Sequence, residues 1–262
     1  MTSILPLVLD DVSLEIGGIR LIKDLSCALA AGPRTVILGA NGAGKSLFLR
    51  LCHGLILPTT GRVLWQGAKD RDPADAQAMV FQRPVMLRRS VAANVDYALK
   101  LRGMAAAERR AAVEDALGHT GLRRLADNPA RVLSVGEQQK LALARAWALQ
   151  PEVLFLDEPT ASLDPASTHA VEQIINAIDA AGTRIVMTTH DLGQARRLAD
   201  EVLFLHRGRL LEEASAERFF SAPENDLAQA FVKGDLVWWQ PGEANRGKEL
   251  PKHDPKQKKR TR

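Results

Sequence analysis

The chain contains a glycine-rich octapeptide, Gly39-Ala40-Asn41-Gly42-Ala43-Gly44-Lys45-Ser46. It matches the phosphate-binding pattern G-x-x-x-x-G-K-[ST]. A β-branched run at 35–38 precedes it and a helix-like apolar run at 46–52 follows, which is the strand–loop–helix context that the motif requires. Glycine allows the backbone N–H groups to surround a phosphate, and the following helix directs the positive end of its dipole to the same place. Lys45 is then expected to reach the β- and γ-phosphates and Ser46 to ligate Mg²⁺, although a plain glycine turn stays an alternative at this point.

The composition is that of a soluble protein with a core of good size. Of the 262 residues, 46% are hydrophobic and 25% are charged. No run approaches about 18 uninterrupted apolar residues, and the first residues lack the basic start of a secretion signal, so a cytoplasmic protein is expected. Cys27 and Cys52 have apolar neighbours and no metal-ligand spacing, which predicts reduced thiols that serve in packing.

The positive net charge is concentrated at the carboxyl-terminal end of the chain. The net charge is +4, but residues 246–262 hold eight basic and two acidic side chains, a net of +6, so the remainder carries −2. The body therefore gives no electrostatic reason to expect a nucleic-acid partner. Residues 241–262 are predicted to be a basic, disordered tail.

Hydrophobic periodicity divides the chain into sheet segments and one helical insertion. Loose alternation over 7–16 and again up to Leu29 predicts an antiparallel hairpin, with 62–65 as a further strand of that layer. Short buried strands are predicted at 79–81, 153–156, 185–188 and 202–205, and helices at 136–149, 164–181, 191–200, 214–220 and 226–232. The period is helical between 90 and 150, and Ser134 and Glu137 have capping-box spacing. Strand, turn and helix units after 150 are typical of a parallel sheet.

Two adjacent acids, Asp157 and Glu158, follow the predicted strand at 153–156. Successive side chains of a strand face opposite ways, so the two acids can serve different purposes. In a nucleotide site Asp157 would bind Mg²⁺ through its water shell, and Glu158 would polarise the attacking water. A pair of acids is more often a solvated strand edge, and the phosphate loop earlier in the chain is what favours the site.

With these motifs in order, residues 5 to 235 resemble the ATP-binding cassette (ABC) ATPases. The matching motifs are the phosphate loop at 39–46 (Walker A), Gln82 (Q-loop), Leu133-Ser134-Val135-Gly136-Glu137-Gln138-Gln139 (signature), 153–158 (Walker B), Ser162-Leu163-Asp164 (D-loop) and His190 (H-loop). The resemblance implies an α/β fold: a P-loop NTPase core with an N-terminal antiparallel β layer and an inserted α-helical subdomain. The ABC domain is expected over 5–240, with the helical subdomain at about 88–150.

The resemblance also implies a site shared between two chains. A head-to-tail homodimer would hold two ATP molecules, each between the phosphate loop of one subunit and the signature of the other. Glu158 would be the general base, His190 would hold the γ-phosphate, Gln82 would contact Mg²⁺ or the lytic water, and Asp164 would cross the interface. The nucleotide-binding set is Gly39, Ala40, Asn41, Gly42, Ala43, Gly44, Lys45, Ser46, Leu47, Ser134 and Gly136, and the Mg²⁺ set is Ser46, Gln82 and Asp157.

Two positions depart from the family pattern. Val135 stands where the signature usually has its first glycine, which affects close backbone approach but spares Ser134 and Gly136. Ile16 is the nearest match to the aromatic residue that usually stacks on adenine. Without a ring the base would be held mainly by apolar contact, so modest nucleotide affinity and modest selectivity for adenine are expected.

The family resemblance places the chain on the inner face of a membrane beside separate transmembrane permease subunits, with a substrate-binding protein as a further partner. The signature and the run Phe219-Phe220-Ser221-Ala222-Pro223 are similar to ATPase subunits of bacterial importers for oxyanions such as tungstate or phosphate. Two alternatives stay open: an exporter ATPase subunit, and a soluble ABC ATPase with a mechanical or scaffold function. The short helical insertion argues against a DNA-repair type, which would need a long coiled coil.

Overall fold

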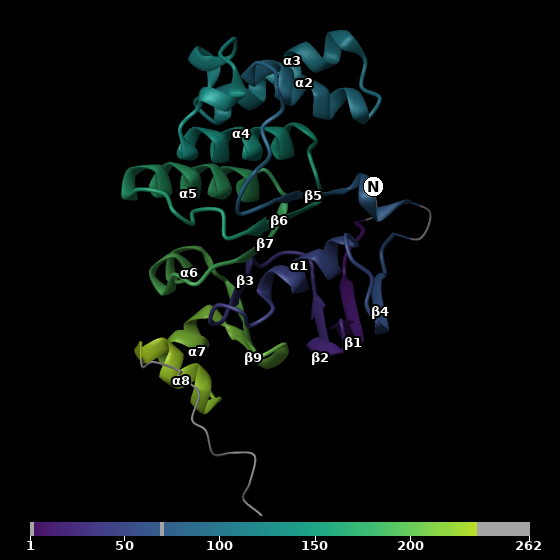
Figure 1. Cartoon of the computed structure of the whole chain (residues 1–262), viewed down its shortest axis with the longest axis vertical. Helices are drawn as coiled ribbons and strands as arrows, with labels where there is room; N and C mark the ends of the chain where they lie inside the picture. Colours follow the sequence, from purple (N-terminus) through teal and green to yellow (C-terminus); the bar gives the residue numbers. More distant parts are fainter. Residues whose placement is uncertain (1–2, 69–70, 235–262) are drawn as a thin grey trace, which may run out of the picture.

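In the computed structural model the described residues, 3–68 and 71–234, form two sheets and a group of helices (Figure 1). The expected disordered tail, 241–262, lies outside these residues. The first sheet is antiparallel, in the order β2-β1-β4. Its strands are β1 (Leu7–Ile16), β2 (Ile19–Leu29) and β4 (Thr60–Trp65). The predicted hairpin and the third strand of its layer are therefore confirmed.

The second sheet has the order β5-β6-β7-β3-β8-β9 and carries the phosphate loop on its middle strand β3. Its strands are β3 (Thr35–Leu38), β5 (Gln77–Val80), β6 (Val153–Asp157), β7 (Arg184–Thr188), β8 (Glu201–His206) and β9 (Arg209–Ser215). Neighbours from β5 to β8 pair in parallel. Their carboxyl ends lie at one edge of the sheet, where ligands of open α/β sheets bind.

The edge strand β9 is not among the strands predicted from the sequence, and it adds one antiparallel pair to the sheet. It pairs antiparallel with β8 through a two-residue turn at Arg207 and Gly208, both with positive φ (48° and 79°). Such turns match the twist of a hairpin. The mixed polarity of 209–215 hid the strand, because an edge strand is only half covered. Strand β5 also differs: it begins two residues earlier than predicted and ends at Val80, before Phe81.

Helices cover the second sheet and extend beyond it. They are α1 (Lys45–His53), α5 (Pro165–Ala180), α6 (Leu192–Leu198), α7 (Ala216–Ser221) and α8 (Asp226–Lys233). Short 3₁₀ turns lie at Pro73–Asp75, before β5, and at Arg123–Leu125 and Ala130–Val132, within the helical insertion. A core of Val, Leu, Ile and Phe side chains lies on each face of the sheet. Helix α1 packs on β6 and β7, so the start of α1 is fixed next to the ends of those strands.

The helical insertion has a hydrophobic cluster of its own. Helices α2 (Val91–Leu101), α3 (Ala106–His119) and α4 (Val135–Ala148) pack around it, and α4 also lies against α5 (Figure 1). The predicted helix at 136–149 is confirmed within one residue at each end. The domain limits of 5–240 and 88–150 stay predictions.

The two cysteines give the fold a test. Burial, with the negative charges of Glu213 and Glu201, raises the pKa of Cys27 to about 12 from an ordinary 9.0, and burial raises that of Cys52 well above its ordinary value. Both thiols are therefore neutral in the folded chain at pH 8.5. Above pH 9 the thiols of the unfolded chain ionise, so the free energy of unfolding falls as the pH rises further. We expect iodoacetamide at pH 8.5 to alkylate the native chain at least about 10-fold more slowly than the urea-unfolded chain, measured by mass spectrometry. Equal rates would contradict this packing.

Candidate functional site

The phosphate loop follows β3 and depends on three glycines with left-handed backbone. The φ angles of Gly39, Gly42 and Gly44 are 152°, 78° and 104°. A Cβ at Gly39 would overlap the carbonyl oxygen of Leu205 on β8, and one at Gly44 would lie 2.8 Å from Cδ1 of Ile22 on β2. The loop is thus held between both sheets, in a conformation that a side chain would prevent.

This loop presents a row of N–H groups to one place. Helix α1 starts after Gly44, and no side chain in the described part of the chain caps it. Among the described residues, no acceptor pairs with the N–H groups of Gly42, Gly44, Lys45, Ser46 or Leu47. Free N–H groups at a helix start, together with the helix dipole, make a site for an anion. Asn41 and Gly42 are exposed at its mouth, and Ala43 is buried beneath.

Lys45 lies under the loop, with only 5% of its side chain exposed. Its Nζ donates to the carbonyl oxygens of Gly39 (2.9 Å) and Ala40 (3.3 Å), and it lies 3.4 Å from Oε1 of Glu158. The ammonium group is therefore balanced by three oxygen atoms. It lies between the phosphate loop and the acids at the end of β6.

The two predicted acids meet the loop at the end of β6. Ser46 Oγ on α1 donates to Oδ1 of Asp157 at 2.8 Å, and Thr188 Oγ1 on β7 donates to the same atom at 2.9 Å. Asp157 is 3% exposed. Ser46 and Asp157, predicted from separate motifs, are thus in direct contact.

Glu158 leaves the strand in an unusual conformation and meets His190. Its φ is +45°, in the left-handed region that residues with a side chain rarely adopt. Its N–H donates to the carbonyl oxygen (3.2 Å) and to Oγ1 (3.0 Å) of Thr188. Its Oε2 lies 3.0 Å from Nδ1 of His190. The carboxylate is therefore held between Lys45 and His190, as expected of a group in one site.

Gln82 lies at the same edge of the sheet as the acids. Val80 on β5 pairs with Leu156 on β6, and Gln82 and Glu158 each come two residues later. Gln82 is exposed. The structure thus places the predicted Q-loop residue one strand away from the acids.

The signature residues form a separate group on the helical insertion. Ser134 Oγ accepts from the N–H of Glu137, and Oε2 of Glu137 accepts from the N–H of Ser134, so the predicted capping box of α4 is confirmed. The N–H groups of Val135 and Gly136 have no acceptor among the described residues. Ser134 and Gly136 make no hydrogen bond with the phosphate loop in the described part of the chain. Within the described part of the chain, two helix starts with N–H groups that lack acceptors, those of α1 and α4, therefore lie apart from each other.

Gly136 and Asp164 both lie against Ser167 at the start of α5. A Cβ at Gly136 would lie 2.7 Å from Oγ of Ser167 on α5. Asp164 caps α5, and its Oδ1 accepts from the N–H groups of Ala166 and Ser167, both at 3.0 Å. These hydrogen bonds, with the hydroxyl of Ser167 as the largest contributor, hold the pKa of Asp164 below its usual value.

Both departures from the family pattern lie at the surface. Val135 is 61% exposed at the start of α4, and Ile16 is 55% exposed at the turn of the β1–β2 hairpin. Ile19, the cross-strand partner of Ile16, is 64% exposed. An exposed aliphatic pair thus lies at the position where the family usually has an aromatic ring.

Sequence reasoning missed Thr188, which contacts both acids. A threonine at the end of an apolar strand, two residues before His190, carries no motif of its own. The only signal available was its position: β7 neighbours β6 in a parallel sheet, so its last residue faces the two acids.

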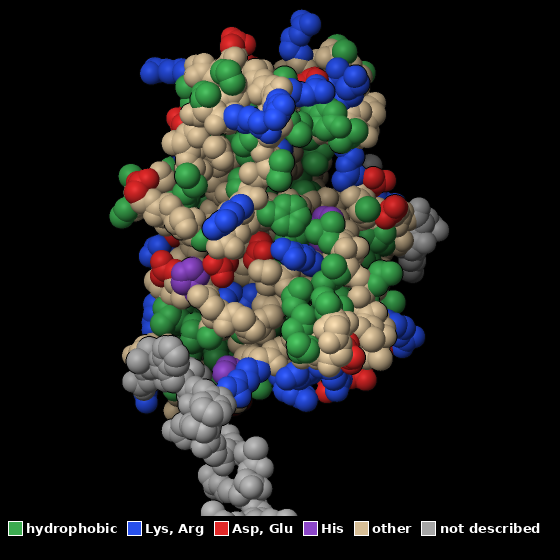
Figure 2. Space-filling view, viewed as in Figure 1, with side chains coloured by type: hydrophobic (Ala, Val, Ile, Leu, Met, Phe, Trp, Pro, Cys, Tyr) green, Lys and Arg blue, Asp and Glu red, His purple; other side chains and the backbone are tan. Residues whose placement is uncertain are grey.

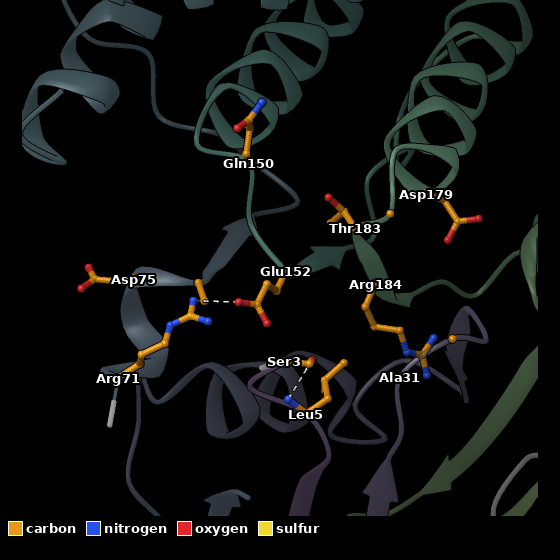
Figure 3. A pocket seen from close by; sticks show the side chains of 13 residues that line it. Ser3, Leu5, Ala31, Arg71, Asp75, Gln150, Glu152, Asp179, Thr183 and Arg184 are labelled. Atoms are coloured by element: carbon orange, nitrogen blue, oxygen red, sulfur yellow. Dashed lines mark hydrogen bonds and ion pairs between the residues drawn. The ribbon is translucent and has the colours of Figure 1, made fainter. Parts of the chain in front are cut away.

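A cavity of about 600 Å³ lies at the opposite end of β6 and β7 and holds none of the predicted site residues (Figure 3). Its charged groups are engaged in the fold. Arg71 pairs with Glu152 at 2.7 Å, and Arg184 donates to the carbonyl oxygen of Ala30 and to Oγ1 of Thr35. These contacts tie the amino ends of the strands together.

Comparison with known proteins agrees with this geometry. The ABC transporter family model matches residues 22–161. A tungstate uptake system ATP-binding protein, TupC, from Peptoclostridium acidaminophilum is 38% identical over 78% of this chain and 94% of its own length. A phosphate import ATP-binding protein, PstB 2, from Natronomonas pharaonis is 34% identical over 87% of this chain and 86% of its own.

The fold of the chain is also similar to solved structures of ABC ATPases. An ATP-binding subunit of an ABC transporter superimposes with a TM-score of 0.75 at 25% identity, over 87% of this chain and 99% of its own. A dimeric ATP-binding cassette in a post-hydrolysis state, bound to ADP and phosphate, has a TM-score of 0.72 at 27% identity, over 80% of this chain and 98% of its own. No helix among the described residues is long and apolar enough to cross a membrane. The chain belongs to the ABC transporter family, as one of its ATPase domains.

Proposed function

We propose that the chain is the ATP-hydrolysing subunit of a membrane importer and that Glu158 is its general base. The observation that carries the proposal is the contact of Glu158 with Lys45 and His190, beside five N–H groups that have no acceptor within residues 3–68 and 71–234. A triphosphate on these N–H groups offers Lys45 a stronger partner than the loop carbonyls. Glu158 is then released from the ion pair and accepts a proton from water, while His190 orients the γ-phosphate.

The residues at the start of α1 fit Mg²⁺. Ser46 and Asp157 bring a hydroxyl and a carboxylate oxygen within 2.8 Å of each other, and Gln82 adds an amide oxygen at the same edge of the sheet. Oxygen ligands of this kind are what Mg²⁺ takes beside phosphate oxygens. When bound, the ion would neutralise charge on the phosphates. Asp157, fixed by Ser46 and Thr188, would orient its water shell.

The second anion site supports a head-to-tail homodimer in the ATP-bound state. The start of α4 has the hydroxyl of Ser134 and two N–H groups that no described residue accepts from, but it lies apart from the phosphate loop. A second copy would bring its signature onto the γ-phosphate, with Asp164 at the interface. The likeness to a dimeric cassette bound to ADP and phosphate supports this arrangement.

An apolar groove next to Gln82 suits a short helix of a permease subunit. It has a volume of about 370 Å³ and lies between β5 and helices α2 and α4. Hydrophobic side chains are visible between the upper helices and the sheet, among charges of both signs (Figure 2). The groove is lined by Phe81, Pro84, Val85, Leu87, Tyr97 and Leu101, of which Val85 and Leu101 are 73% and 71% exposed.

Charged replacements in the groove test the docking. Val85→Asp and Leu101→Glu are expected to lower co-purification with the permease subunit by at least about 10-fold, because burying a carboxylate in an apolar contact is costly. The basal ATPase rate of the separated chain should stay within about 2-fold, since neither residue touches the phosphate site. Undiminished co-purification would contradict this groove as the docking site.

For the cargo we propose an inorganic oxyanion such as tungstate or phosphate. A substrate-binding protein would deliver it to the transmembrane permease subunits, while this chain lies on the inner face of the membrane. The similarity to phosphate and tungstate import proteins supports an oxyanion. A cobalt import protein from Rhodobacter capsulatus is also similar, at 37% identity, and it favours a metal cation instead. Uptake of labelled tungstate, phosphate and cobalt should be compared in cells with and without the gene. Loss confined to cobalt would contradict the oxyanion, and unchanged uptake of every ion together with ATP-dependent efflux would indicate an exporter.

A further inference from the structure

Thr188, the last residue of β7, contacts both acids of the site through one hydroxyl group. Its side chain is fully buried. Oγ1 donates to Oδ1 of Asp157 at 2.9 Å and accepts from the N–H of Glu158 at 3.0 Å. A hydroxyl has one hydrogen to donate and two lone pairs. The single hydrogen is therefore committed to Asp157, and one lone pair to Glu158.

On the side of Asp157, the hydroxyl completes a clamp. Oδ1 accepts from Ser46 on α1 and from Thr188 on β7. These donors belong to two different elements, a helix packed on β6 and the strand beside it, so together they fix the carboxylate against rotation. Because Asp157 is only 3% exposed, water cannot readily replace a missing donor.

On the side of Glu158, the hydroxyl supports a backbone conformation that is otherwise unfavourable. The φ of +45° directs the carboxylate toward Nζ of Lys45 (3.4 Å) and Nδ1 of His190 (3.0 Å). The N–H that anchors this turn has two acceptors, the hydroxyl and the carbonyl oxygen of Thr188. Loss of the hydroxyl leaves the carbonyl alone, at 3.2 Å.

We propose that Thr188 is a positioning residue for ATP hydrolysis, whose hydroxyl fixes Asp157 and Glu158 relative to each other. The inference rests on the proposed functions of these acids. Thr188 acts through them, so it is expected to affect the rate of the chemical step and the response to Mg²⁺ more than the affinity for ATP. Mutation of residues that orient the ligands of a metal site typically lowers metal affinity or activity by about 10- to 100-fold.

Two replacements separate positioning from packing. Thr188→Val keeps the branched shape and removes the hydroxyl, whereas Thr188→Ser keeps the hydroxyl and removes a buried methyl group. If Thr188 only packs, Ser should be the more damaging change. If it positions the acids, Val should be the more damaging one. The order of the two variants in kcat is therefore opposite under the two explanations.

We expect Thr188→Val to lower kcat by about 10- to 100-fold with KM for ATP within about 3-fold, and Thr188→Ser to keep kcat within about 3-fold. A second readout needs no turnover: binding of a fluorescent ATP analogue is measured in Mg²⁺ and in EDTA. The gain in affinity from Mg²⁺ should fall at least about 5-fold in the Val variant alone, with affinity in EDTA unchanged.

Thr183, which directly precedes the first residue of β7, offers a matched control. It is 7% exposed, and its Oγ1 donates to the carbonyl oxygen of Pro151 at 2.9 Å, far from the acids. Thr183→Val removes the same group from a buried place. It should leave kcat and the Mg²⁺ response within about 2-fold, even if thermal stability falls.

The proposal is overturned if Thr188→Val keeps wild-type kcat and Mg²⁺ response, or if Thr188→Ser is as slow as Thr188→Val. If the Val variant does not fold, Ala and Ser at 188 give the same comparison, because they differ only by the hydroxyl. A wild-type chain that binds Mg-ATP without hydrolysing it would contradict the proposed function instead, so the two failures are distinguishable.

Discussion

Replacing Glu158 with glutamine is expected to lower kcat for ATP hydrolysis by at least about 100-fold and to leave ATP affinity within about 3-fold. The amide has nearly the shape of the carboxylate and keeps a hydrogen bond toward His190, but it cannot accept a proton from water. The variant should also accumulate as a dimer in Mg-ATP, because the nucleotide that joins the two copies is not consumed. Phosphate release and light scattering measure the two effects on one sample.

Glu152→Gln is the matched control for this experiment. Glu152 directly precedes β6 and Glu158 directly follows it, so the same chemical change is made at the two ends of one strand. Glu152 pairs with Arg71 and accepts from the N–H of Ile4, and these contacts lie away from the phosphate loop. Its replacement should reduce stability and leave kcat within about 2-fold. A Glu158→Gln variant that retains more than a tenth of the wild-type rate would contradict Glu158 as the base.

The sequence predicted most of this site because its residues occur in local motifs. Spacing within the phosphate loop determines that Lys45 and Ser46 start α1, and the Ser134–Glu137 capping box marks the start of α4. Each of these features depends on residues a few positions apart. Alternation and turn residues likewise predicted the β1–β2 hairpin.

Features that depend on distant residues were harder to predict. Strand β9 is formed by pairing with β8, and its own composition is that of a polar edge. The positive φ of Glu158 and the contact of Thr188 with both acids follow from the pairing of β6 with β7, which are separated by helix α5 in the chain. Neither feature has a signal in the nearby sequence. A threonine at the end of a strand is common, because β-branched residues favour strands.

Replacing Lys45 with methionine is expected to weaken ATP binding by about 10- to 100-fold, because charged hydrogen bonds to phosphate are worth about 1.5–3 kcal/mol each. Methionine has a similar length and fills the space under the loop, so the loss is mainly one of charge. Hydrolysis should fall below detection, since Lys45 both binds the phosphates and faces Glu158. Isothermal titration with ATP and a phosphate-release assay measure the two effects.

The same variant tests whether Lys45 exchanges its contacts with the loop carbonyls and Glu158 for contacts with ATP. Before nucleotide binds, the ammonium group of Lys45 is held by two loop carbonyls and by Glu158. ATP must therefore replace these contacts, and the wild-type chain should gain thermal stability that rises with the logarithm of the ATP concentration divided by Kd. In Lys45→Met this gain should be smaller than in the wild type at the same ATP concentration, because ATP binds about 10- to 100-fold more weakly. Lys100→Met, which replaces an exposed lysine on α2, should respond as the wild type does. An unchanged ATP-dependent shift in Lys45→Met would show that the loop amides alone hold the phosphates and that the lysine serves only to balance Glu158.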